Sequence, residues 1–288
     1  MTILPKKFCG SPIRLSALLA ILFYSFPVYA YHLPLWEVGV GVGNLNSSHY
    51  RGAKTRANVT LPIPFAVYRG ERLKADRGGL RGKFFASGKM NLTLSGSFGI
   101  PVKSEDTNTR LGMPDLDPLV EIGPSLNVNL WKTKDTNHVL WLKMPVRLAF
   151  SVGDPLMKYH GFNFAPFIQI FNRYPKRSTE WRLKMSLGPI FGDGRYNNYY
   201  YEVDAQYATP EREEYHASSG YSGSRATLSI ARNSKHLFFG IFARYDNLSS
   251  ATFVDSPMVE TKDSLIYGLA IAWVFGRSDT DAKHTDDD

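Results

Sequence analysis

The sequence LIYGLAIAWVF, residues 265–275, alternates between two kinds of side chain. Its odd-numbered positions are large and apolar, and its even-numbered positions are mostly small. Successive side chains of a strand point to opposite faces, so this pattern predicts one bulky apolar face and one face of small residues. Strands of soluble sandwiches usually combine an apolar face with a polar one, whereas strands of membrane barrels turn the bulky face to lipid. The stretch therefore predicts a lipid-facing β-strand.

The same stretch contains a candidate assembly signal. Gly268, Ile271, Trp273 and Phe275 form a pattern that resembles the C-terminal signal of outer-membrane barrels. We therefore expect the barrel-assembly machinery to recognise this strand. The chain continues through residues 276–288 and ends in aspartates. We expect this acidic tail to be disordered, because its polar composition cannot bury a core.

The N-terminus has the pattern of a secretory signal peptide. Lys6, Lys7 and Arg14 precede an apolar run at residues 15–26, and the sequence VYA at 28–30 provides small residues for cleavage. The apolar run is too short to span a bilayer comfortably. Residues 1–30 are therefore predicted to be removed during export, which leaves residues 31–275 for the barrel.

Composition excludes several kinds of chemistry. The single cysteine, Cys9, falls within the predicted signal peptide, so the exported chain is expected to lack disulfides, thiolate metal ligands and a cysteine nucleophile. The seven histidines match no metal-binding or nucleophile motif. The formal net charge is +8, and the basic residues are scattered rather than clustered, unlike those of a nucleic-acid binder. We expect no catalytic residue, no metal, no cofactor and no nucleic acid, and predict that the protein is not an enzyme.

Segments with a period of two recur along the chain, and none of them reads as an amphipathic helix. Residues 140–150 and 181–191 both set an apolar face against a face that carries cations. Cations imply water on their side of the sheet, so these segments predict a transmembrane antiparallel β-barrel with a polar lumen. The candidate lumen charges are Lys143, Arg147, Arg182, Lys184 and Arg244.

The pattern predicts about twelve strands, and ten or fourteen also fit the length. One strand is expected within residues 83–98, and another at the tyrosine-rich residues 196–206. Pro62 and Pro64 lie inside a predicted strand, which is awkward because a closed sheet needs every backbone donor.

The predicted count also assigns a side to the long polar connection at residues 99–118. With both barrel ends in the periplasm, strands alternate in direction and this connection falls on the periplasmic side. A long periplasmic connection is unusual and could dock a partner; a lumen plug or an ordered turn is the alternative. The candidate partner contacts are Arg110, Gly112, Met113, Pro114, Asp115 and Asp117.

Several separated motifs resemble those of the MipA/OmpV family of outer-membrane proteins. They occur in order between about Trp36 and Phe275, and they read LPIPFAVYRGERLKADRGGLRG (61–82), RLGMPDLDPLVEIGPSL (110–126), YYYEVDAQYATPEREEY (199–215), SGYSGSRATLS (219–229), FGIFARYDNL (239–248) and DSPMVE (255–260).

The resemblance implies an outer-membrane barrel that contacts membrane lipids and lipopolysaccharide. At least one family member acts as a scaffold between a lytic transglycosylase and a peptidoglycan synthase. We therefore expect a non-enzymatic scaffold for a lytic transglycosylase and a penicillin-binding protein. The alternative is a small-solute channel, which the candidate lumen cations would make selective for anions.

Overall fold

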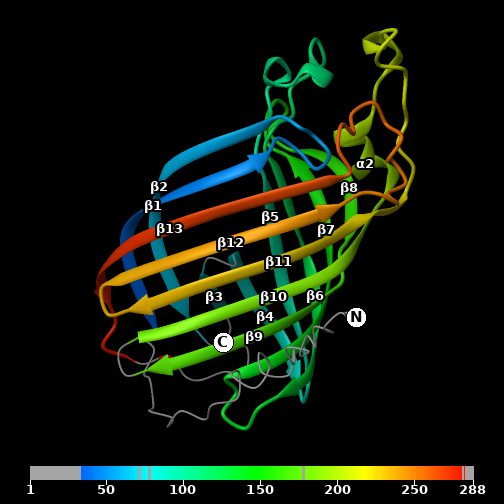
Figure 1. The fold of residues 1–288 in the computed structure, drawn as a ribbon. Helices are drawn as coiled ribbons and strands as arrows, with labels where there is room; N and C mark the ends of the chain where they lie inside the picture. Colours follow the sequence, from blue (N-terminus) through cyan, green and yellow to red (C-terminus); the bar gives the residue numbers. More distant parts are fainter. Residues whose placement is uncertain (1–33, 71–72, 77–78, 177–178, 281, 283–288) are drawn as a thin grey trace, which may run out of the picture.

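A computed structural model describes residues 34–70, 73–76, 79–176, 179–280 and 282; the side chains of residues 71–87 are not described. Within these residues, thirteen strands form one antiparallel sheet (Figure 1). The strands are β1 (Trp36–Ser48), β2 (Arg56–Arg69), β3 (Leu73–Asp76), β4 (Gly79–Ser87), β5 (Met90–Gly99), β6 (Leu119–Lys132), β7 (His138–Ser151), β8 (Lys158–Phe164), β9 (Phe167–Lys176), β10 (Thr179–Gly192), β11 (Gly220–Ser234), β12 (Leu237–Asn247) and β13 (Asp263–Arg277).

The sheet returns on itself, so the strands form a ring. β13 pairs with β1, and each strand from β1 to β7 pairs with the next. β8 and β9 both lie between β7 and β10, and they therefore share one position in the ring. The ring has about twelve strand positions, and the predicted all-β outer-membrane barrel is confirmed.

The predicted number of strands is correct only because two local errors cancel: one strand was missed and another was predicted where none forms. Residues 83–98 contain parts of two strands, because Gly88 adopts a positive φ of 54° and reverses the chain between β4 and β5. Residues 196–206 contain no strand, because residues Gly194–Tyr201 form the helix α2. Asp193 begins this helix, since its side chain accepts a hydrogen bond of 2.8 Å from the backbone nitrogen of Tyr196. Among the described helices, none is long and apolar enough to cross a membrane.

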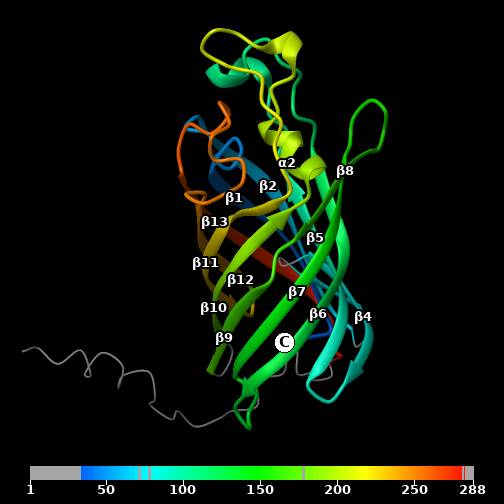
Figure 2. The same ribbon diagram turned by 90° about the vertical axis from the view of Figure 1, so that its right-hand side faces the viewer.

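The extra hairpin changes the side of the long connection at residues 100–118. It lies at the same end of the barrel as connections 49–55, 193–219 and 248–262, and we call this the loop end (Figure 2). The opposite end carries short turns at 88–89, 133–137 and 235–236 and both ends of the barrel sequence, and we call it the turn end. The prediction that this connection shares a side with the chain ends was therefore wrong. The correction moves Arg110, Gly112, Met113, Pro114, Asp115 and Asp117 to the loop end.

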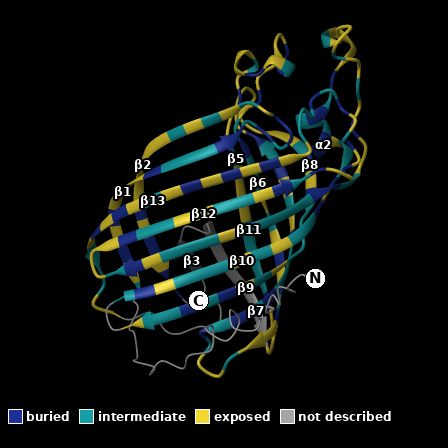
Figure 3. Cartoon of the chain, viewed as in Figure 1, coloured by how far each residue is buried: buried dark blue, intermediate teal, exposed yellow. Residues whose placement is uncertain are grey.

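Burial alternates along the strands as a membrane barrel requires (Figure 3). On β13, every large side chain from Leu265 to Phe275 on the outward face is exposed, whereas Ile266 and Val274 on the inward face are buried. Gly268 faces inward at a close approach: a Cβ atom there would lie 2.8 Å from Phe242 and 2.9 Å from the carbonyl oxygen of Asn44. A larger residue would therefore not fit without movement of the neighbouring strand.

The ordered chain extends beyond the predicted end of the barrel. β13 continues to Arg277, and the backbone nitrogen of Ser278 donates a hydrogen bond of 3.0 Å to the carbonyl oxygen of Trp36. Leu35 in turn donates to the carbonyl oxygen of Thr280 at 2.8 Å. The barrel therefore extends past the predicted boundary at residue 275, and the expected disorder of the remaining tail stays a prediction. Residues 283–288, which include the three terminal aspartates, and the predicted signal peptide lie outside the described residues.

Candidate functional site

The connections of the loop end pack together into one apolar cluster, which we call the cap. Phe253 stacks on Tyr201, with ring centroids 3.7 Å apart and planes 12° from parallel, and both rings are almost fully buried. Because the members come from four different connections, each connection holds the others in place. The buried members are Tyr50, Ala53, Val102, Met113, Leu116, Tyr201, Val203, Ala217, Leu248, Ala251, Phe253 and Met258.

Hydrogen bonds attach the cap to the barrel. The hydroxyl of Tyr201 donates to the carbonyl oxygen of Arg51 at 2.9 Å. The Nη1 atom of Arg51 then donates to the carbonyl oxygen of Ser222, on β11, at 2.7 Å. The cap is therefore anchored to the barrel wall as well as packed within itself.

The candidate contacts within residues 100–118 divide into buried and exposed side chains. Arg110 is 4% exposed and its Nη2 atom donates to the carbonyl oxygen of Pro114 at 3.1 Å, while Met113 belongs to the cap. Asp115 accepts a hydrogen bond of 2.6 Å from the backbone nitrogen of Ser104, which lowers the pKa of its carboxyl group. Arg110 and Met113 therefore hold the connection together. The exposed members are Gly112, Pro114, Asp115 and Asp117.

Two hairpins project from the cap and hold each other (Figure 2). Arg212 donates to the carbonyl oxygens of Thr109 and Leu111 at 2.9 and 3.0 Å. In the hairpin that carries Arg212, His216 lies 2.9 Å from Glu202 and 3.2 Å from Glu214, and hydrogen bonds to these carboxylates raise its pKa. Over the part of the chain that the structure describes, no group of three or more acidic, histidine or cysteine side chains is arranged to hold a metal ion.

The structure places all five candidate lumen charges on inward-facing strand positions, because each shares a face with buried neighbours across the sheet. Arg147 is the best defined: its Nε and Nη2 atoms donate to the hydroxyl of Ser95 at 3.0 and 2.7 Å, and its Nη1 atom lies 3.9 Å from Glu121. Lys143 and Lys184 lie over aromatic rings of neighbouring inward residues. The lumen therefore carries ordered positive charge.

Sequence reasoning missed the carboxylates that accompany these cations. Asp246 is fully buried and lies 2.6 Å from Arg225 and 3.4 Å from Arg244, and Glu180 pairs with Arg182. The signal was present, because Asp246 follows Arg244 by two residues and so shares its face. These pairs lower the cost of burying the cations.

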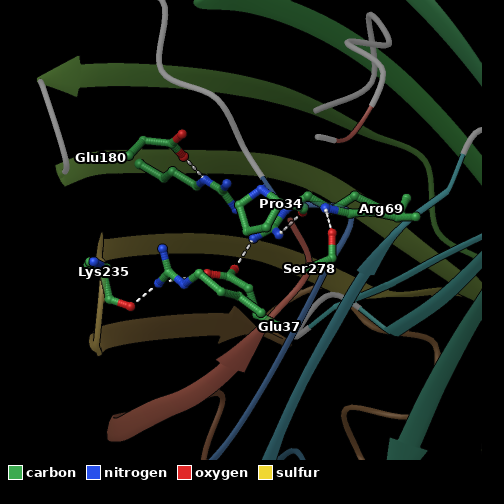
Figure 4. A network of polar contacts seen from close by, with 9 residues as sticks. Pro34, Glu37, Arg69, Glu180, Lys235 and Ser278 are labelled. Carbon is green, nitrogen blue, oxygen red and sulfur yellow. Dashed lines mark hydrogen bonds and ion pairs between the residues drawn. The ribbon is translucent and has the colours of Figure 1, made fainter. Parts of the chain in front are cut away.

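A second buried network lies at the turn end and joins the first and last strands (Figure 4). The Nη2 atom of Arg69 lies 2.5 Å from Oε2 of Glu37, and its Nη1 atom donates to the carbonyl oxygen of Pro34 at 2.8 Å. Arg277 approaches the same carboxylate at 3.7 Å. The network therefore fixes β2 and β13 to β1 at the point where the ring closes.

The turn end also carries a set of exposed lysines, which we call the lysine rim. The turns at 88–89, 133–137 and 235–236 and the ends of β6 and β9 contribute them. Sequence reasoning missed the set because its members are far apart along the chain and come together only through the strand topology. The lysine rim consists of Lys89, Lys132, Lys134, Lys176 and Lys235.

The residues of the candidate assembly signal lie together on β13. Ile271, Trp273 and Phe275 point outward and are 44%, 60% and 57% exposed. The rings of Trp273 and Phe275 are 5.7 Å apart. Gly268 faces inward, so only the three large residues present a common surface to the membrane.

Comparison with known proteins identifies a family. The sequence profile of "MltA-interacting protein MipA" matches residues 38–275. No curated protein sequence matches the chain.

Among solved structures, similar chains include a bacterial polysaccharide outer membrane secretin, the NanC porin and the outer membrane protease OmpT from Escherichia coli. Their sequence identities are 7%, 6% and 6%, and their TM-scores are 0.41, 0.35 and 0.32. The alignments cover 83%, 82% and 83% of this chain and 99%, 98% and 96% of the respective structures.

Proposed function

The chain belongs to the family of the MltA-interacting protein MipA, and from this membership we propose that it is a non-enzymatic scaffold for peptidoglycan-remodelling enzymes. It is an outer-membrane β-barrel. In the proposed role, its turn end lies in the periplasm and binds a lytic transglycosylase, which a penicillin-binding protein joins. The barrel-assembly machinery inserts the chain, and lipids and lipopolysaccharide surround it.

The observation that carries the proposal at the level of residues is the lysine rim. Exposed lysines lie on several separate turns at one end of the barrel, where they outnumber the exposed acidic residues Asp135 and Asp279. Such a patch attracts a partner with an acidic surface and speeds its association. The proposal thus moves the docking surface from residues 99–118 to the opposite end of the barrel.

The buried network of Glu37, Arg69 and Arg277 stabilises the turn end, which carries the lysine rim. It holds the first, second and last strands together directly beneath the turns. A docking surface on fixed strands loses little conformational entropy when a partner binds. The turn end is therefore a suitable platform for another protein.

The channel alternative draws support from a different observation, the inward-facing cations. Lys143, Lys184 and Arg147 would favour anions in an open lumen. The cap packs the connections together at the loop end, next to this lumen. Family membership supports the scaffold instead, so the scaffold is the better supported proposal.

A charge-reversal experiment tests the scaffold proposal. Lys89, Lys134, Lys176 and Lys235 are changed to glutamate, and the purified barrel is used to capture lytic transglycosylases and penicillin-binding proteins from a periplasmic extract. We expect the variant to lose at least about tenfold in capture, because like charges now face the acidic partner. Capture by the wild type should also weaken with added salt.

The matched control reverses four exposed lysines at the loop end, Lys54, Lys103, Lys158 and Lys262. This variant has the same net charge as the first and should capture the enzymes as well as the wild type does. Equal capture by both variants would contradict docking at the lysine rim. Failure of the wild type to retain either enzyme would contradict the scaffold function itself.

A further inference from the structure

Over the part of the chain that the structure describes, backbone pairing around the barrel wall is interrupted between β2 and β5, and we call this interruption the lateral opening. β2 pairs with β1 along thirteen residue pairs but with β3 only at Tyr68 and Arg69. β5 pairs with β6 along its whole length but with β4 only from Met90 to Thr93. Among the described residues, 56–67 of β2 and 94–99 of β5 therefore have no ladder partner on their facing sides.

Two prolines mark the β2 side of this opening. The backbone nitrogen of Arg69 donates to the carbonyl oxygen of Leu35, so the odd-numbered nitrogens of β2 point toward β1. The nitrogens of Pro62 and Pro64 therefore point into the opening. No neighbouring strand pairs with β2 there, so the missing N–H groups of the two prolines cost no hydrogen bond. Prolines at such an edge also discourage the addition of another strand. The positions that are awkward in a closed sheet are thus suited to an edge that stays open.

The opening faces the membrane rather than water. Pro62 and Pro64 pair with Val42 and Val40 of β1, whose side chains point outward and are exposed. On its other side β1 pairs with β13, which places Ile271 and Trp273 beside the same two valines. These apolar residues are all exposed on the outer face of the barrel. The opening therefore lies at the level of the lipid chains.

The inner surfaces of the two rims differ in chemistry. Leu61 and Ile63 of β2 face the lumen, since they pair with the inward residues Gly43 and Gly41, yet they are 57% and 40% exposed. Phe242, which faces the lumen from β12, is also exposed. The lumen is thus lined by accessible apolar side chains on the β2 side.

The β5 rim is polar and is backed by cations. Arg147 of β7 binds the hydroxyl of Ser95 on β5 through two nitrogens. Lys143 pairs across the sheet with Asn127, whose amide donates to Asn91 and Thr93 of β5 at 2.7 and 2.9 Å. One rim therefore suits an acyl chain, and the other suits an anionic group with hydrogen-bond acceptors.

We propose that the opening admits an anionic lipid from the surrounding leaflet, with its phosphate near Lys143 and Arg147 and its acyl chains lying over Leu61 and Ile63. Charge complementarity supports an anion, because inward-facing cations outnumber carboxylates in the described strands. The cations include Arg69, Lys143, Arg147, Arg173, Arg182, Lys184, Arg225, Arg244 and Arg277, and the carboxylates are Glu37, Glu121, Glu180 and Asp246. This site is independent of the lysine rim and of any protein partner.

Spin labels at single cysteines test the opening. In a Cys9→Ser background, a nitroxide is attached to Ile63→Cys at the rim, to Val42→Cys on the lipid face, or to Ser229→Cys on the closed wall of the lumen. The barrel is placed in phosphatidylcholine vesicles, and the access of dissolved oxygen to each label is measured. We expect the label at position 63 to resemble the one at position 42. A label at position 63 that is as protected as the one at position 229 would overturn the lateral opening.

Lipid selection tests the charged half of the site. The barrel is exchanged into vesicles that contain phosphatidylglycerol, and the lipid that stays bound after transfer to detergent is measured by native mass spectrometry. We expect Lys143→Gln to retain phosphatidylglycerol about tenfold more weakly than the wild type, equivalent to about 1.4 kcal/mol. Lys103→Gln, at the loop end, is the matched control and should retain it normally.

Three outcomes would overturn the lipid assignment. The first is equal retention of phosphatidylglycerol and phosphatidylcholine by the wild type, which would remove the preference for an anion. The second is unchanged retention by both Lys143→Gln and Arg147→Gln, which would move the site elsewhere. The third is full displacement of the lipid by inorganic phosphate at millimolar concentration, which would identify a free anion as the ligand.

Discussion

Replacing Phe253 by alanine is expected to unfold the cap while leaving the barrel intact. Phe253 is fully buried and stacks on Tyr201 at the centre of a cluster drawn from four connections. Truncation of a buried phenylalanine costs about 3–5 kcal/mol, more than loop segments of this size can usually lose and remain ordered. Hydrogen exchange should show faster exchange of the amides in residues 100–118, 193–219 and 248–262, with the strand amides unchanged.

Leu111→Ala is the control for this effect. Leu111 is an apolar residue of the same cap region, but it is 61% exposed at the tip of its hairpin. Its truncation should change stability by less than about 0.5 kcal/mol, as is usual for exposed positions. Unchanged exchange of the loop amides in Phe253→Ala would show that the connections do not depend on a shared core.

Replacing Glu37 by glutamine is expected to destabilise the barrel itself. The change removes the charge that accompanies Arg69, whose side chain is only 6% exposed, and it also weakens the contact with Arg277. Removing one partner of a buried ion pair typically costs about 3–5 kcal/mol, because the remaining charge stays buried. The urea concentration at the midpoint of unfolding in detergent should fall accordingly.

Glu105→Gln provides the matched control for Glu37→Gln. Glu105 pairs with Lys103 at 3.6 Å, but both side chains are about 70% exposed. An exposed pair contributes about 0–1 kcal/mol, so this variant should unfold close to the wild type. A midpoint for Glu37→Gln equal to that of Glu105→Gln would contradict a structural role for the buried network at the ring closure.

The barrel could be predicted from sequence because its strands have a simple period. On β13, the large outward residues from Leu265 to Phe275 alternate without interruption with inward residues that are mostly small. Lipid on one face and a crowded lumen on the other impose this period wherever a strand crosses the membrane. Local patterns of this kind need no knowledge of distant contacts.

The cap could not be predicted because its cause is tertiary. The run Tyr199–Tyr201 has high strand propensity, yet it forms the end of α2. There Tyr201 stacks on Phe253, which lies more than fifty residues away in sequence. The missed hairpin at Gly88 had a similar effect, because one turn residue reversed the direction of every later strand up to α2. The strand count was correct because the missed hairpin and the strand wrongly predicted at residues 196–206 cancel. Every connection between these two places was nevertheless assigned to the wrong end of the barrel.

The candidate site was therefore only partly predictable. The inward cations Lys143, Arg147, Arg182, Lys184 and Arg244 follow from strand alternation alone, and the structure places them as that alternation requires. The lysine rim and the lateral opening depend instead on which turns share an end and which strands are short. Pro62 and Pro64 were the one local signal of the opening.

Site-directed labelling in intact cells tests the central claim, which is that the loop end faces outward and the turn end faces the periplasm. In a Cys9→Ser background, Asp106→Cys lies on the connection at residues 100–118 and Lys134→Cys lies on the lysine rim. With a maleimide that cannot cross the outer membrane, we expect labelling at residue 106 in intact cells and labelling at residue 134 only after the outer membrane is permeabilised. Labelling at residue 134 but not at residue 106 in intact cells would contradict the orientation and, with it, the docking surface proposed for the turn end.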